Sequence, residues 1–184
     1  MLIGKLDFLP ILQHPELLSQ PTAAYLFGLP GDVTAAVGVA KINPNYADGN
    51  ELCKQYDTDP QMCGNCIIVE AKRGEKLWFV ACLVPLNNKM DLNGFVRRQL
   101  HARRVSLAPK AATIELSGME YGSINPTGLP AEWSILIDAR LANADLVITG
   151  SGLVASKLLL PGKLLAQLPN ATVVESLGVP IGTK

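Results

Sequence analysis

This sequence of 184 residues contains few histidines and few aromatic residues, and neither charge is in excess. It contains 2 histidines, 5% aromatic residues, and 16 basic against 16 acidic residues, so its formal net charge is zero. Aliphatic side chains must therefore fill the core, and a hydrophobic share of 48% is enough for a substantial one. Zero net charge argues against a broad footprint on duplex DNA, where affinity comes from many phosphate contacts.

Several functional signatures are also missing. There is no apolar run of about 18 residues that would span a membrane, and no basic segment followed by an apolar one that would mark a signal peptide. We therefore expect a cytoplasmic protein with no membrane partner. The glycines match neither the dinucleotide fingerprint nor the P-loop. No G-x-S-x-G motif accompanies His14 or His101, so a serine hydrolase is not indicated.

Four cysteines allow two interpretations. A structural zinc site would need four ligands, and Cys63-Gly-Asn-Cys66 has a suitable spacing, with Cys53 and Cys82 to complete the set. However, Cys66 and Cys82 lie in apolar, strand-like runs, where a reduced cysteine behaves as a small hydrophobic residue. Buried or partly exposed thiols are the better interpretation, so we do not expect a structural zinc site.

The order of the expected elements is mixed. A helix capped by Asp48 is followed by a hairpin and then by helices alternating with short strands. The N-terminal part, residues 5–18, is expected to form short helical turns, and residues 20–34 a loop-rich connector. The expected strands are 36–42, 65–73, 76–85, 105–108, 135–137, 146–148 and 172–174, and the expected helices are 50–56, 91–102, 109–117 and 161–168. This pattern favours an α+β domain over a doubly wound parallel sheet.

The stretch 117–152 carries the strongest candidate for a functional site. Two glycine-bearing turns flank the short strand 135–137, which ends in Asp138. The second turn, Gly150-Ser151-Gly152, leaves backbone N–H groups that we expect to point at a ligand. An ordinary pair of connectors is an open alternative, and so is a helix-capping role for Asp138. Lys157 is more often solvated than directed into a pocket.

One basic cluster stands out against the neutral background. It consists of Arg97, Arg98, Arg103 and Arg104, close together along the chain. The cluster is either a solvated helix face or a rim that contacts phosphates.

The glycine motifs follow one another in a familiar order. Residues Asp91-Leu92 and 103–108 precede Gly118-x3-Gly122-x3-Pro126-x-Gly128, and Ile137-Asp138, 150–152 and Pro161-Gly162 come after it. In this order and spacing the chain resembles the YbaK, or prolyl-tRNA-synthetase-associated, domain family, over roughly residues 42–177.

The resemblance implies a mixed α/β fold with a central, mostly antiparallel, barrel-like sheet and surrounding helices. It divides the chain into an N-terminal extension (1–40) that packs on the domain, an editing domain (41–178) and a tail (179–184). It also implies a trans-acting hydrolase that cleaves the ester of mischarged tRNA without a metal or an organic cofactor and so supports translation fidelity. The implied partners are the tRNA acceptor end and an aminoacyl-tRNA synthetase.

The same resemblance implies the residues of the site. Those with a catalytic role are Asn65, Gly150, Ser151 and Gly152. Those that bind the substrate are Gly118, Gly122, Ser123, Pro126, Gly128, Asp138 and Ser156. The oxyanion of the reaction would be stabilised by backbone amides, and a pocket lined by small residues would sort amino acids by size.

Two departures from the family pattern keep other functions open. The family places a lysine, which is thought to anchor the substrate end, where this chain has Asn65, and an amide cannot replace an ammonium that faces phosphate. After Gly152 the family often has a basic residue and an aspartate, whereas this chain has Leu153, Val154 and Ser156, and Lys157 compensates only in part. A relative that binds an aminoacyl group or tRNA end without cleaving it is therefore one alternative, and a plain interaction module is another.

Overall fold

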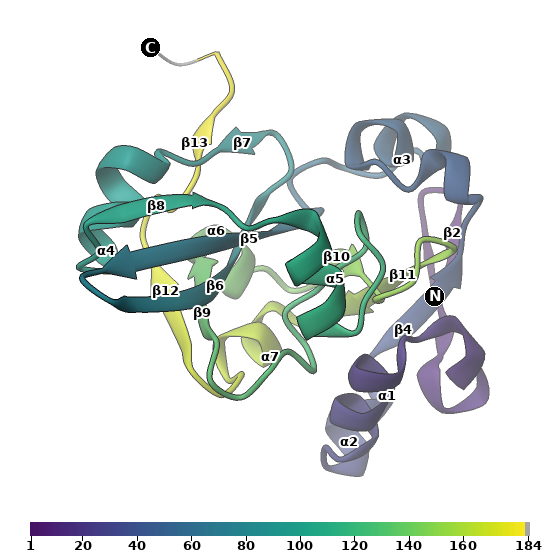
Figure 1. Cartoon of the computed structure of the whole chain (residues 1–184). Coiled ribbons are helices and arrows are strands. Elements are labelled where there is room, and N and C mark those ends of the chain that lie inside the picture. The colour runs from purple at the N-terminus through teal and green to yellow at the C-terminus, as the bar shows by residue number, and fades with distance from the viewer. Residues whose placement is uncertain (183–184) are drawn as a thin grey trace.

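The computed structural model describes residues 1–182, whose strands form two main sheets (Figure 1). The larger sheet has the strand order β12-β9-β6-β5-β8 and the smaller one β10-β11-β4-β3. The strands of the larger sheet are β5 (Gly64–Arg73), β6 (Lys76–Pro85), β8 (Arg104–Leu107), β9 (Ser134–Asp138) and β12 (Ala171–Val174). Those of the smaller sheet are β3 (Leu9–Pro10), β4 (Gly38–Lys41), β10 (Val147–Gly150) and β11 (Ser156–Leu160).

The two sheets differ in strand direction. In the larger sheet β5 is antiparallel to β6 and β8, whereas β9 is parallel to both β6 and β12. The smaller sheet is antiparallel throughout. Two short pairs complete the strands within residues 1–182: β1 (Leu2–Ile3) with β2 (Leu6–Asp7), and β7 (Asn88–Lys89) with β13 (Val179–Pro180).

The expected α+β class is confirmed, but the expectation of a barrel-like sheet is wrong. Both main sheets in residues 1–182 are open, with β12 and β8 at the edges of one and β10 and β3 at the edges of the other. A single parallel bridge between Cys63 and Ile148 joins them. Because strand pairing between the sheets is limited to that bridge in residues 1–182, the sheets do not close into one cylinder, although their side chains share one buried hydrophobic cluster.

The helices are short and lie around the sheets. The α-helices are α1 (Gln20–Phe27), α2 (Gly31–Ala35), α3 (Gly49–Tyr56), α4 (Arg97–Gln99), α5 (Lys110–Ser117), α6 (Ala139–Ala142) and α7 (Gly162–Ala166). Single turns of other helix types are η1 (Ile11–Gln13), η2 (Pro15–Leu17), η3 (Pro44–Tyr46) and η4 (Leu92–Val96). Two expected caps are confirmed: Asp48 accepts the amide of Asn50, and Asp91 accepts those of Gly94 and Phe95.

The structure departs from four local expectations. Residues 20–34 are not a connector but contain α1 and α2, because Pro21 occupies a first helical turn, where no amide donor is needed. Residues 5–18 contain β2 and β3 besides their helical turns. No element was expected at residues 156–160, which form the fully buried strand β11. At the C-terminus, where we expected frayed residues from Gly178 on, Val179–Pro180 forms β13, while residues 183–184 lie outside the described residues.

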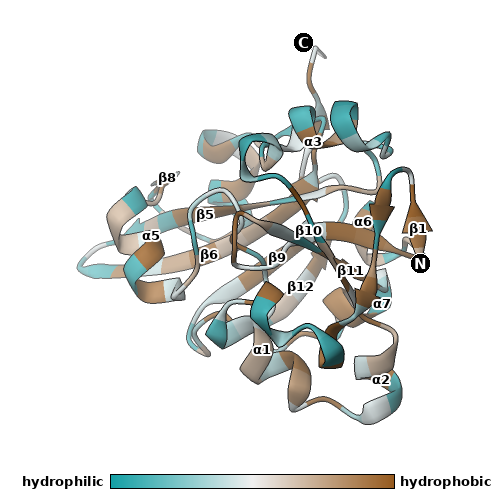
Figure 2. Ribbon diagram, turned by 90° about the vertical axis from the view of Figure 1, so that its right-hand side faces the viewer, coloured by the Kyte–Doolittle hydropathy of each residue, from teal (hydrophilic) through white to brown (hydrophobic). Residues whose placement is uncertain are grey.

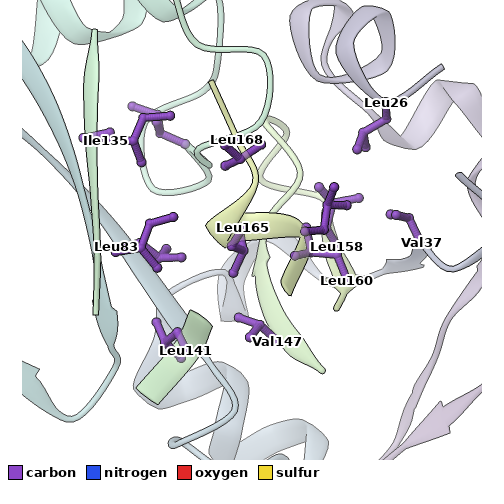
Figure 3. Close-up of a cluster of buried hydrophobic side chains, with 14 of the residues drawn as sticks. Leu26, Val37, Leu83, Ile135, Leu141, Val147, Leu158, Leu160, Leu165 and Leu168 are labelled. Atoms are coloured by element: carbon purple, nitrogen blue, oxygen red, sulfur yellow. The ribbon is translucent and has the colours of Figure 1, made fainter. Parts of the chain in front are cut away.

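Aliphatic side chains fill the core, as the composition predicts. Leu83 of β6, Leu158 of β11 and Leu165 of α7 are completely buried in one cluster (Figure 3). Burying each such side chain contributes roughly 1.5–3 kcal/mol. Leu26 and Val37 of the N-terminal segment belong to the same cluster. Figure 2 shows the corresponding pattern along the ribbon, with hydrophobic central strands and hydrophilic turns at the periphery. The proposed domain boundary near residue 41 stays a prediction.

Candidate functional site

A cavity of about 570 Å³ opens at the junction of the two sheets. Its walls come from the first half of β5, the end of β10, the start of α3 and the loop before Ile124. Cys63 and Ile148, which form the bridge between the sheets, both line it. The incomplete closure of the sheets therefore creates the space that a ligand can enter.

The wall of the cavity is mixed in character. Its apolar part includes Leu52, Ile67, Ile68, Leu86, Leu107, Ile124, Ile148 and Val154. Its polar side chains are Asp48, Asn65, Thr113, Tyr121, Thr149 and Lys157. An apolar lining with a few polar groups, in a space of this volume, is typical of a small-molecule site.

Two loops make up one side of the cavity and hold each other in place. The amide of Gly152 donates to the carbonyl of Ser123 (2.8 Å), and the Ser123 hydroxyl donates to the carbonyl of Leu153 (2.7 Å). The Glu120 carboxylate accepts the amide of Val154 (2.5 Å). The loop 118–128 and the loop 150–154 are thus fixed to each other by both backbone and side-chain bonds.

The structure places three of the expected site residues at the cavity. Asn65 begins its β5 wall, Gly122 lies in the adjoining loop and Gly150 ends β10. Asn65 and Gly122 are exposed, and no hydrogen bond of the Asn65 side chain or the Gly122 amide is found within residues 1–182. Both groups are therefore available to a ligand.

The other expected site residues do not line the cavity: Gly118, Ser123, Pro126, Gly128, Asp138, Ser151, Gly152 and Ser156. The expectation that the amides of Ser151 and Gly152 point at a ligand is wrong, because both donate to Ser123. The hydroxyls of Ser151 and Ser156 lie 2.7 Å apart, and that of Ser156 donates to the carbonyl of Leu17. These serines fasten the N-terminal segment to the loop behind the cavity wall.

Asp138 has a structural environment and not the substrate contact that we expected. It caps α6 through the amide of Arg140, and its two carboxylate oxygens each accept a guanidinium nitrogen of Arg140 at 2.7 Å. Burial by itself raises the pKa of Asp138, but the bonds from Arg140 and from the amide of Gly178 outweigh it and lower the net value. The open alternative, a capping role, describes this residue.

Gly128 has a similar supporting function. Its φ is +81°, and a Cβ at this position would lie 2.3 Å from the carbonyl oxygen of Pro21. A side chain is therefore excluded where the loop packs on the N-terminal segment.

Two polar residues of the cavity were not among the predicted site residues. Lys157, expected to be solvated, is only 6% exposed and donates from Nζ to the carbonyl of Ala47 (3.0 Å). Thr149 is 2% exposed, and its hydroxyl is a buried side-chain group without a hydrogen-bond partner in residues 1–182. Thr149 directly follows the expected strand 146–148, and Lys157 lies in residues 156–160, where no element was expected, so no local pattern marked either residue as part of a site.

The four cysteines are free thiols. Cys53 and Cys63 lie with their sulfurs 3.6 Å apart, and no disulfide forms among the four. Burial, and then the neighbouring Cys53, raises the pKa of the Cys63 thiol to about 12, so a nucleophilic thiolate is disfavoured. Across the described part of the chain, no group of three or more His, Cys, Asp or Glu side chains is placed to hold a metal ion.

A second depression, the basic cleft, has a volume of about 610 Å³. It is lined by Arg73, Arg97, Arg98, His101, Ala102 and Arg103. Three of the four arginines of the predicted basic cluster belong to it, whereas Arg104 does not. No carboxylate forms an ion pair with these arginines in the described structure, so their charge is directed to solvent.

The chain is thus a mixed α/β domain with a cavity at the junction of two open sheets. The model of the aminoacyl-tRNA editing domain matches residues 43–168, and the chain belongs to this family. The resemblance seen in the glycine motifs is thereby confirmed.

Solved structures show the same fold. A candidate trans-editing enzyme for prolyl-tRNA synthetase aligns with a TM-score of 0.70 at 18% identity, over 86% of this chain and 97% of that one. The hypothetical protein APE2540 aligns with a TM-score of 0.66 at 18% identity, over 77% of this chain and 90% of that one. No curated protein matches the sequence. No helix in residues 1–182 is long and apolar enough to cross a membrane.

Proposed function

We propose that this chain is a trans-acting aminoacyl-tRNA deacylase, which hydrolyses the ester between a wrongly attached amino acid and the 3′ end of tRNA. The observation that carries the proposal is the cavity itself, which lies within the residues that match the editing family. A space of about 570 Å³ accommodates an aminoacyl group and the terminal ribose. Its apolar wall would discriminate amino acids chiefly by steric exclusion.

Hydrolysis of an aminoacyl ester requires few catalytic groups from the protein. A water oxygen forms a bond to the ester carbonyl carbon, the bond from that carbon to the ribose oxygen breaks, and a proton lost by the water passes to the ribose oxygen. Because the ester is already activated, positioning of the water and stabilisation of the oxyanion suffice. The unpaired amide of Gly122 is the donor that we assign to the oxyanion, and Asn65 is the side chain that we assign to the substrate end. The hydroxyl of the neighbouring ribose carbon assists the water.

The basic cleft extends the proposed interface to the body of the tRNA. It lies at the far end of β5, which runs eight residues from Asn65 to Arg73, roughly 26 Å at about 3.3 Å per residue. A tRNA whose 3′ end occupies the cavity is long enough to bring its phosphate backbone to this cleft. Arginines without carboxylate partners are suited to that contact.

A second candidate function is binding without cleavage. It is favoured by Asn65, which carries no positive charge, and by the engagement of the Ser151 and Gly152 amides with Ser123. In that case the cavity would hold an aminoacyl group or a tRNA end and the ester would persist.

Deacylation of a panel of mischarged tRNAs, beginning with small amino acids on the proline tRNA, tests the proposal. Val154→Trp, which would fill the cavity, should abolish hydrolysis, whereas Leu116→Trp, at an exposed position outside the cavity, should preserve it. If folded wild-type protein hydrolyses no pair above the spontaneous rate, the enzyme proposal is wrong. Retention of charged tRNA on filters would then support the binding function, and failure to bind would favour an interaction module.

A further inference from the structure

Lys157 is a buried lysine that forms no ion pair within residues 1–182. It lies on β11 opposite Gly150, and its side chain is 94% shielded from solvent, since 6% is exposed. It lines the same cavity as Asn65, Thr149 and Gly150. A lysine ammonium is rarely found at this depth without a partner of opposite charge.

The protein satisfies this ammonium only in part. Of its three N–H donors, one is accounted for by the carbonyl of Ala47. No carboxylate in residues 1–182 lies within ion-pair distance, although Asp48 is near enough to act on Lys157 electrostatically. The other groups that act on it are the thiols of Cys63 and Cys53. Two donors are thus left for a group that enters the cavity.

A purely structural role does not explain the residue. The neighbours on its face of the sheet, Ile148 and Leu159, belong to an apolar cluster with Leu52 and Cys63. An aliphatic side chain of similar length would fill the same space without the desolvation of a charge. The hydroxyl of Thr149, buried and unpaired on the neighbouring strand, is a second polar group of this cavity that lacks a partner.

We propose that Lys157 is the anion-binding residue of the cavity and binds a negatively charged oxygen group of the substrate, a phosphate or a carboxylate, and not the oxyanion that forms during the reaction. The inference rests on the proposed function, which it makes more specific: the ammonium that position 65 lacks is supplied from β11. The negatively charged group has two sources in an aminoacyl-tRNA. One is the phosphate on the 5′ side of the terminal adenosine, and the other is the side chain of an acidic amino acid. Both would complete the two open donor positions.

Calorimetric titration with small probes separates these sources. Adenosine 5′-monophosphate is compared with adenosine, and L-aspartate with L-asparagine. We expect the charged member of one pair to bind roughly tenfold or more tightly than its neutral partner, as is typical of hydrogen bonds to a charged group. The pair that shows the preference identifies the source.

Three variants assign the preference to a residue. Lys157→Met should reduce the ratio to about one, while Lys163→Met, which removes an exposed lysine of α7, should leave it unchanged. The double variant Asn65→Lys/Lys157→Met should restore the preference, because the ammonium returns to the same cavity from β5. A preference that persists in Lys157→Met, or wild-type protein that shows none for either pair, would overturn the inference.

A measurement on the wild-type chain covers the case in which Lys157→Met does not fold. In protein labelled with ¹⁵N in its lysine side chains, the Lys157 amine resonance should shift on addition of the preferred probe, and a resonance that stays in place refutes the contact. Deacylation is assayed separately. Probe binding that depends on Lys157 without deacylation would contradict the proposed enzyme and leave the anion site standing, and deacylation without such binding would do the reverse.

Discussion

Gly150 lies so close to Ser123 that the two loops of the cavity leave no room for a side chain between them. A Cβ on Gly150 would be 2.1 Å from the carbonyl oxygen of Ser123 and 2.5 Å from its carbonyl carbon. The same carbonyl accepts the amide of Gly152, and the Ser123 hydroxyl donates to Leu153. The loop 118–128 therefore positions the end of β10, and with it the part of the wall that faces Asn65.

Gly150→Ala should displace this wall. The added methyl group meets backbone and not a flexible side chain, so we expect a loss of about 1–3 kcal/mol in the free energy of unfolding, together with reduced deacylation. Gly31→Ala is the matched control, because a Cβ there meets nothing within 4 Å. Urea denaturation of both variants measures the difference, and equal stability of the two would show that the loops separate easily.

Asp138 and Arg140 predict a dependence of stability on acid. The pKa of Asp138 is lowered in the folded protein, so its contribution is complete above the usual value of 3.8 and is lost as the pH falls through the lower folded value. Asp138→Asn should therefore be less stable than wild type at pH 7, and the gap should narrow below about pH 3.8. Denaturation curves at several pH values test this, and a gap that is constant with pH would exclude the ion pair as its cause.

Thr149→Val addresses the unpaired hydroxyl of the cavity. Because the Thr149 Oγ1 atom is buried without a protein partner, its removal should raise the free energy of unfolding by about 1–3 kcal/mol. If the hydroxyl serves the substrate, the same variant should lower deacylation. Thermal unfolding and the deacylation assay are read together, and a variant less stable than wild type would show that the hydroxyl is satisfied in solution.

The sequence predicted most of the elements because their patterns are local. The hairpin of β5 and β6 and the capped helix α3 follow from β-forming runs, a turn glycine and Asp48. The strand β11 was not predicted, since Ser156 and Lys157 interrupt its apolar pattern although both are buried. The open sheets also escaped prediction, because the pairing of distant strands depends on tertiary contacts that no local pattern encodes.

Three of the predicted site residues, Asn65, Gly122 and Gly150, line the cavity, whereas most of the others support the loops behind its wall. Glycine motifs identify where backbone must approach closely, and Gly150 and Gly152 do so against Ser123 and Ser19. They do not reveal whether the approaching group is a ligand or another loop. Lys157 lies shortly after these glycines in the sequence. Its burial results from the pairing of β11 with β4 and β10, which the sequence pattern does not reveal.

The basic cleft predicts how tRNA binding depends on salt. Arg97, Arg98 and Arg103 line the basic cleft at the Arg73 end of β5, whereas the cavity opens at the Asn65 end, so these arginines should contribute to affinity and not to chemistry. Each arginine that contacts a phosphate should lower the slope of log affinity against log salt by about 0.7–0.9 when it is replaced by glutamine. Lys163→Gln is the control. Unchanged slopes in all three arginine variants would place the tRNA body elsewhere.

The buried ammonium of Lys157 predicts that the stability of the protein depends on pH in the alkaline range. Burial holds the pKa of Lys157 below the usual 10.5 in the folded protein. The unfolded chain therefore binds this proton more tightly than the folded protein does. The free-energy penalty for burying the charge is complete only at pH values below the folded pKa. The stability of wild type relative to Lys157→Met should therefore rise with pH up to about 10.5 and then level off. The groups that face Lys157, namely Asp48, Cys53 and Cys63, are present in both proteins, so taking the difference largely removes their own titration. Denaturation curves between pH 6 and 11 measure this difference in the free energy of unfolding. The range extends from well below to just above the ordinary pKa of a lysine. If instead it falls with rising pH, the ammonium already has a strong anionic partner within the protein, and Lys157 then has little capacity left for a substrate.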